Sequence, residues 1–240
     1  MENIPTFIAL AFGAITLLTL FMLLKAARWS RVVVIATLAW TIILSAISLT
    51  GIFTETSGMP PRFAPVIAVP LLTITALFAT PQGRAFISGL DQGLLVLLNT
   101  IRIPVELVLY GLFIHGAVPE LMTFTGRNWD ILSGITTPFI WWFGYRKRAL
   151  PRAVLIGWNV VCLALLFNIV INAILAAPFD FQQQAFDQPN TAIFYFPYVL
   201  LPGVVVPIVL FSHLVLLRSL VNRLTEQDGS TIVRTPLREG

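Results

Sequence analysis

Two residues of opposite charge lie inside a long hydrophobic stretch of this chain. Arg102 and Glu106 stand among aliphatic residues in the segment 94–117. An ionisable side chain at the centre of a membrane helix costs about 2.5–3.5 kcal/mol, and such residues pair with one another or mark a polar pathway. Their spacing of four residues places them on one face of a helix, where they can form an ion pair. The pair predicts either a structural lock between helices or the floor of a polar site with a proton-accepting carboxylate.

Other polar side chains are expected to surround that floor. Tyr110 continues the face of Glu106 by one turn, and Asn168 and Asn172 are one turn apart in the segment 152–176. Asparagine side chains commonly form contacts between membrane helices. Two tyrosines approach from the same predicted outer side. The predicted wall of the site consists of Tyr110, Asn168, Asn172, Tyr195 and Tyr198.

A second polar set lies toward the predicted outer surface, where it would form a lid or an acid–base site. The chain has two histidines. His115 belongs to this set, whereas His213 is expected near the opposite end of the bundle, so the two cannot share a metal. The single cysteine, Cys162, excludes a disulfide within the chain and a thiolate cluster. The sequence therefore predicts neither metal nor cofactor. The outer set consists of His115, Glu120, Arg127, Asp130 and Asp187, with Asn128 and Gln188 as further lid residues.

The composition indicates what kind of elements must position these residues. Hydrophobic residues make up 57% of the chain and charged residues 11%, and the mean hydropathy is +0.87. Soluble domains carry about 25% charged residues. Continuous apolar segments of about 20 residues can cross the roughly 30 Å of hydrocarbon in a bilayer. The expected fold class is all-α, a polytopic membrane protein.

Seven hydrophobic segments predict seven transmembrane helices in one domain, 1–222, followed by a mobile cytoplasmic tail, 223–240. A short amphipathic segment, 82–92, is expected to lie at the membrane surface. Prolines in the last hydrophobic segment favour a kink or an unwound turn. The predicted helices are 5–27, 32–53, 63–80, 94–117, 131–145, 152–176 and 191–220.

The basic residues predict the orientation. With the N-terminus outside and the C-terminus in the cytoplasm, outer loops hold only Arg62 and Arg127, as the positive-inside rule expects. Basic residues at helix ends anchor the protein in a membrane, so the net charge of +4 does not indicate nucleic acid as a partner. The cytoplasmic set consists of Lys25, Arg28, Arg31, Arg84, Arg146, Lys147, Arg148, Arg152, Arg218, Arg223, Arg234 and Arg238.

The stretch 102–110, continuing through 115–124, resembles a group of uncharacterised bacterial integral membrane proteins, and the similarity extends through 187–190 into the last hydrophobic segment. The resemblance implies a multi-pass protein of the bacterial inner membrane. It implies no activity.

Three functional hypotheses follow. The first is binding or transport of a small polar solute or cation, coupled to protons, in an outward-facing polar cavity. The second is a membrane enzyme that acts on a lipid or quinone, with His115, Glu120 and Asp130 as acid–base groups. The third is a structural or assembly subunit. The predicted partners are the lipid bilayer and a small polar ligand or cation, and the oligomeric state stays open.

Overall fold

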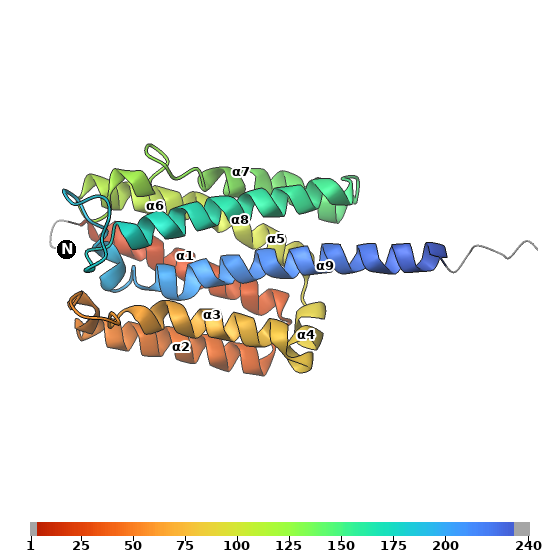
Figure 1. Cartoon of the computed structure of the whole chain (residues 1–240), viewed down its shortest axis with the longest axis horizontal. Coiled ribbons are helices and arrows are strands. Elements are labelled where there is room, and N and C mark those ends of the chain that lie inside the picture. The colour runs from red at the N-terminus through yellow and green to blue at the C-terminus, as the bar shows by residue number, and fades with distance from the viewer. Residues whose placement is uncertain (1–3, 233–240) are drawn as a thin grey trace, which may run out of the picture.

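The computed structural model describes the backbone of residues 4–232 and the side chains of residues 4–222. Within these residues the secondary structure is helical, without a strand (Figure 1). The predicted all-α class is therefore confirmed. The α-helices are α1 (Thr6–Ala26), α2 (Arg31–Leu49), α3 (Ala64–Ala79), α4 (Pro81–Ser88), α5 (Gln92–Leu98), α6 (Arg102–Ile114), α7 (Ile131–Phe139), α8 (Arg152–Leu175) and α9 (Val206–Ile232).

Short 3-10 and π-helical segments extend several of these helices. The 3-10 turn Asn99–Ile101 joins α5 to α6 in one apolar rod. A π-helical segment, Ile140–Arg146, continues α7, and another, Leu201–Val205, leads into α9. A helix with π-type turns is locally wider, and such turns are frequent at functional sites.

Within the described residues, five helices are long and apolar enough to cross a membrane, or up to six if a bent pair counts as one crossing. The bent pair is Ala64–Ala79 with Pro81–Ser88, which meet at 90°. The bend follows from Thr80, whose hydroxyl accepts a hydrogen bond from the backbone N–H of Gly83 and so begins a new helix. The five are Thr6–Ala26, Arg31–Leu49, Gln92–Ile114, Arg152–Leu175 and Leu201–Asn222.

The last helix begins later than the sequence predicts. Residues 195–199 form a bend and turns instead of the first part of the expected helix 191–220. Pro197 and Pro202 lack the N–H that a continuing helix needs. The N–H groups of Thr191 and Ala192 instead donate to the carbonyl of Ala117, at 3.1 and 3.0 Å. At its other end α9 continues to Ile232, into the expected tail, and residues 233–240 lie outside the described residues.

The helices form one bundle with α9 near its middle (Figure 1). Helix α9 packs on α5 and α8, and α1 packs on α5 and α6. Helices α2 and α3 form one side of the bundle, and α6, α7 and α8 the other. The Trp40 indole of α2 donates to the carbonyl of Gly203 at 2.8 Å, which ties α2 to the start of the last helix. Helix α6 packs on α1 and α7, and its charged residues Arg102 and Glu106 are buried in the bundle.

Candidate functional site

The two charges predicted inside a hydrophobic stretch are enclosed by the bundle. Arg102 is 3% exposed and Glu106 2% exposed, both in the span Gln92–Ile114. A buried charge is tolerated only when other groups pair with it and replace its lost hydration. The side chains around Arg102 and Glu106 therefore decide what this site can do.

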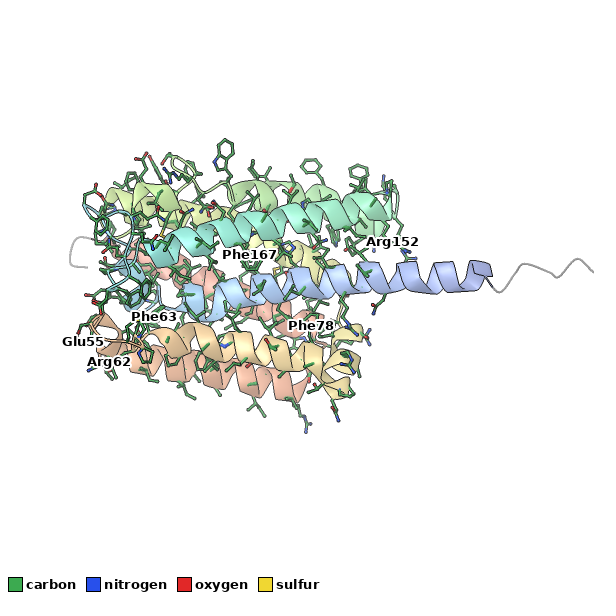
Figure 2. The ribbon with its side chains drawn as sticks, in the orientation of Figure 1. Glu55, Arg62, Phe63, Phe78, Arg152 and Phe167 are labelled. Atoms are coloured by element: carbon green, nitrogen blue, oxygen red, sulfur yellow. The ribbon has the colours of Figure 1, made fainter. Side chains whose placement is uncertain are left out.

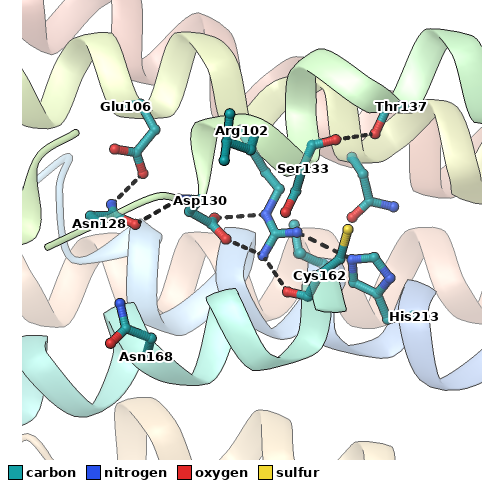
Figure 3. A network of polar contacts seen from close by, with 12 residues as sticks. Arg102, Glu106, Asn128, Asp130, Ser133, Thr137, Cys162, Asn168 and His213 are labelled. Carbon is teal, nitrogen blue, oxygen red and sulfur yellow. Dashed lines mark hydrogen bonds and ion pairs between the residues drawn. The ribbon is translucent and has the colours of Figure 1, made fainter. Parts of the chain in front are cut away.

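Asp130, at the start of α7, is the ion-pair partner of Arg102. Its Oδ2 accepts from the Arg102 Nε at 2.7 Å, and its Oδ1 lies 2.5 Å from Nη2. This fork-to-fork geometry is the strongest arrangement of a guanidinium and a carboxylate. Nη2 also donates to the carbonyl of Cys162 in α8 at 3.2 Å. Arg102 thus joins three helices through one side chain (Figure 3).

The fourth contact of Arg102 fixes the state of a buried histidine in α9. The Arg102 Nη1 lies 3.3 Å from the His213 Nε2. A guanidinium can only donate, so Nε2 is the acceptor and Nδ1 carries the hydrogen. That hydrogen points at the Oδ1 of Asn159, 2.9 Å from Nδ1. His213 is therefore a neutral acceptor of Arg102 in the bundle interior.

Glu106 binds Asn128 rather than Arg102. The Asn128 Nδ2 donates to the Glu106 Oε1 at 2.5 Å, and the Asn128 Oδ1 accepts from the backbone N–H of Asp130 at 3.1 Å. The second carboxyl oxygen of Glu106, Oε2, is buried and has no hydrogen-bond partner among the described residues. The network therefore runs from Glu106 through Asn128 and Asp130 to Arg102 and His213 (Figure 3).

The pairing corrects two sequence-based predictions. The expected ion pair between Arg102 and Glu106 is not formed, and the ion pair found within the described residues joins Arg102 to Asp130. Asp130 was expected in an outer loop but is buried. The physical reason is the path of residues 118–130, which turn inward before α7 begins and bring a second carboxylate to the guanidinium.

The residues of the predicted wall do not form one surface around the charged pair. The Tyr110 ring packs on Phe124, with ring centres 5.0 Å apart, and the Asn168 amide donates to the carbonyl of Arg127 at 2.9 Å. These two residues therefore lie against the 118–130 segment. Asn172 donates to the Asn168 Oδ1 at 3.2 Å and accepts from Gln184, in the loop after α8, at 3.0 Å.

The two tyrosines lie elsewhere. Tyr198 is buried against Phe12 of α1, with ring centres 5.6 Å apart, and lines a small cavity of otherwise mostly apolar residues. Tyr195 is exposed. The structure gives neither tyrosine a contact with the charged network.

The outer set is likewise separated. His115 donates through Nδ1 to the carbonyl of Gly111 on its own helix, at 2.7 Å. Glu120, Arg127 and Asp187 are exposed, and only Asp130 of this set reaches the buried network. Among the described residues, no three His, Cys, Asp or Glu side chains are grouped so that they could hold a metal ion.

A polar surface hollow lies apart from the network, in the loop between α2 and α3. Glu55 accepts a hydrogen bond from the Ser57 hydroxyl, and Arg62 lies nearby (Figure 2). Two effects lower the pKa of Glu55: the larger is the hydrogen bond from Ser57, and the next is the positive charge of Arg62. Gly58 donates to Asp180 at 3.2 Å, which links this loop to the one after α8.

The site predicted from the sequence did not include three members of the network. Asn128 was expected only as a surface lid residue, His213 only near a helix end, and Asn159 only as one polar residue of a hydrophobic segment. Asn128 and Asn159 are both fully buried. For Asn159 and His213, the available signal was a polar residue within an apolar segment. For Asn128, no signal distinguished it from its loop neighbours.

The fold and site define an all-helical protein with several helices able to cross a membrane and an interior network of charged and amide side chains. Residues 62–221 match the family described as "Domain of unknown function (DUF8737)", and the chain belongs to that family. The match covers α3 to α8 and most of α9, and with them every residue of the network. The comparisons with curated proteins and with solved structures found no match.

Proposed function

We propose that the protein binds or transports a small polar solute or cation across the bacterial inner membrane, with Glu106 as the group that couples this step to protons. The observation that carries the proposal is the uneven pairing of the charges in the network. Asp130 neutralises Arg102 at 2.5 Å, whereas the Glu106 Oε2 has no hydrogen-bond partner among the described side chains. A membrane-buried carboxyl without a cationic partner is a functional-site hypothesis by default.

The charge balance favours a cation, including a proton, over an anion. Arg102 and Asp130 together carry no net charge, and His213 is neutral in the tautomer that Arg102 requires. An ionised Glu106 would therefore leave one negative charge that a bound cation or proton cancels. Because the carboxyl group is enclosed, a proton is the smallest such partner and the one that the closed arrangement accommodates directly.

The proposed topology has seven crossings, with the N-terminus outside. Beyond the five long helices, α3 and the rod formed by α7 and Ile140–Arg146 would also cross. Each has 16 residues, about 24 Å at 1.5 Å per residue, so the bilayer would thin locally around them. Arg62 and Arg152, expected outside and inside, lie at opposite ends of the bundle (Figure 2), which supports this orientation.

A purely structural role is the second candidate, because Arg102 is enclosed and pairs with three helices. The enzyme hypothesis has less support: Asp130, one of its acid–base groups, is held by Arg102, and His115 bonds to its own helix. The structural and transport roles differ in one measurable respect. A lock needs no proton exchange at Glu106, whereas coupled binding does.

The decisive variant is Glu106→Gln, which keeps the size of the side chain and removes its proton exchange. In wild-type protein, infrared difference spectra taken across a pH series should show the carbonyl band of a buried carboxylic acid. The same protein in phosphatidylethanolamine–phosphatidylglycerol vesicles should take up protons when a potassium diffusion potential is applied, as read by a trapped pH dye. In Glu106→Gln the band should disappear and uptake should fall to that of protein-free vesicles.

The matched control is Glu120→Gln, because Glu120 is exposed in the outer segment. It should keep both the carbonyl band and the proton uptake. Wild-type spectra without a pH-dependent band, or unchanged uptake in Glu106→Gln, would contradict the proposed function and leave the structural role.

A further inference from the structure

The 118–130 segment, which connects α6 to α7, is irregular but anchored in the bundle. Val118, Met122 and Asn128 are buried, whereas Phe124 and Trp129 are exposed. Its 3-10 turn, Glu120–Met122, contacts both α6 and α8. A loop with few regular backbone bonds opens at lower free energy than the helices around it. The segment thus covers one side of the network with an element that can move on its own.

The start and the end of the segment are held differently. At its start, the Gln188 amide donates to the carbonyls of Val118 and Phe113, at 2.7 and 2.9 Å. Toward its end, the Asn168 amide of α8 donates to the carbonyl of Arg127. The start is thus fixed to the neighbouring loop, and the end is held by α8 and by the buried network.

Among the described residues, Asn128 is the side chain that hydrogen-bonds this segment to Glu106. Its Nδ2 donates both to the Glu106 Oε1 and to the carbonyl of Met122, the second at 3.1 Å, and its Oδ1 accepts from the N–H of Asp130. All three bonds depend on one amide group that is fully buried. Losing the bond to Glu106 would leave a buried amide and a buried carboxyl both short of a partner.

From these contacts we propose that the 118–130 segment is the lid of the polar site, that Asn128 is its latch, and that a cation or proton on Glu106 releases it. A proton on the unpartnered Oε2 turns Oε1 into the carbonyl oxygen of a neutral acid, which accepts the Asn128 N–H more weakly than a carboxylate does. A cation that also binds Oε1 displaces the Asn128 amide, because an N–H group can only donate. The path opens between the lid and α8, where the Asn168 amide still donates to the carbonyl of Arg127. This inference rests on the proposed function, since it names how occupation of Glu106 opens the site.

The chain contains its own reporter of this opening. Cys162 is the only cysteine of the sequence and is buried. Its carbonyl accepts from Arg102, so the residue lies beside the guanidinium that Asp130 holds (Figure 3). A thiol reagent can reach it only after the side chains around it have moved, among them Arg102 and Ser133 of α7, the helix that the lid leads into. The rate of modification of Cys162 therefore measures the open fraction.

The test is modification of the full chain in lipid vesicles by N-ethylmaleimide, followed by mass spectrometry of the intact protein. Asn128→Ala should react several-fold faster than wild type. Asn190→Ala is the matched control, because Asn190 is equally buried but its amide donates to the carbonyl of Ala173 and not to Glu106. Asn190→Ala should react at the wild-type rate. Equal rates in the two variants, whether both slow or both fast, would overturn the latch.

A second variant keeps the proposal testable if Asn128→Ala folds poorly. Asn128→Asp places a carboxyl against Glu106, in a region where Arg102 and Asp130 are the other charged groups. At low pH the two carboxyls can share a proton and keep the lid closed, and at high pH both ionise and repel. The rate of Cys162 modification, divided by the wild-type rate at each pH, should therefore rise with pH. A flat ratio would overturn the latch, while the infrared band of Glu106 in wild type would still decide the proposed function separately.

Discussion

Replacing Arg102 by methionine is expected to lower the free energy of unfolding by about 3–5 kcal/mol, because the change leaves the Asp130 carboxylate buried without its partner. Asp130 is held by two nitrogens of the guanidinium, at 2.7 and 2.5 Å. The variant also removes the donor from which the His213 Nε2 and the Cys162 carbonyl each accept a hydrogen bond. Unfolding in detergent, followed by circular dichroism, measures the loss.

Two further variants show whether the ion pair is the cause. Arg127→Met makes the same substitution at an exposed position of the lid and should change stability by less than about 0.5 kcal/mol. The double variant Arg102→Met with Asp130→Leu replaces both charges by apolar groups and should recover most of the loss, as a buried pair exchanged for apolar residues often does. An Arg102→Met protein as stable as Arg127→Met would show that Asp130 is not paired as described.

The close approach of α7 to α6 makes Gly134 the second sensitive position. A Cβ atom at Gly134 would lie 2.7 Å from the Ile103 Cγ1 and 3.0 Å from the Ile103 backbone nitrogen. Neither distance is compatible with van der Waals contact, and the backbone atom cannot rotate away. Gly134→Ala should therefore push α7 off α6 and cost about 1–3 kcal/mol, as overpacking in a well-packed core does.

Gly157→Ala is the control for Gly134→Ala. Gly157 also lies in a helix, α8, but a Cβ there meets nothing within 4 Å. Alanine favours a helix over glycine by about 1 kcal/mol, so Gly157→Ala should be neutral or stabilising. Thermal unfolding of both variants in the same detergent measures the difference. If the two variants melt at the same temperature, the helices are farther apart than the structure places them.

We expect Gly134→Ala to affect the polar site as well as stability. Asp130 directly precedes α7, so a shift of α7 away from α6 would also lengthen the ion pair with Arg102. Gly134→Ala should then make Cys162 more reactive to maleimide, in addition to its effect on stability. The glycine thus sets the distance at which the lid closes.

The sequence located the helices well, because the length and hydropathy of a segment are local properties. The predicted segments 5–27, 32–53 and 152–176 agree closely with α1, α2 and α8, and the amphipathic 82–92 contains most of α4. The late start of the last helix was the main error. It arose because local proline signals could not tell a kinked helix from the turns that the Ala117 carbonyl and the prolines together stabilise. The number of crossings and the orientation of the termini stay predictions.

What the sequence determined by itself is that Arg102 and Glu106 lie in the interior of a helical bundle, since the apolar residues around them leave no other place for that segment. Only the tertiary structure decided their partners. Asp130 is 28 positions from Arg102 and His213 is 111 positions away, and Asn128 stands in a loop whose residue types resemble its neighbours. The choice between Glu106 and Asp130 for the guanidinium depended on the backbone path of residues 118–130. Hydrophobic periodicity carries no information about that path, because an irregular segment is positioned by the sum of its contacts rather than by a repeat.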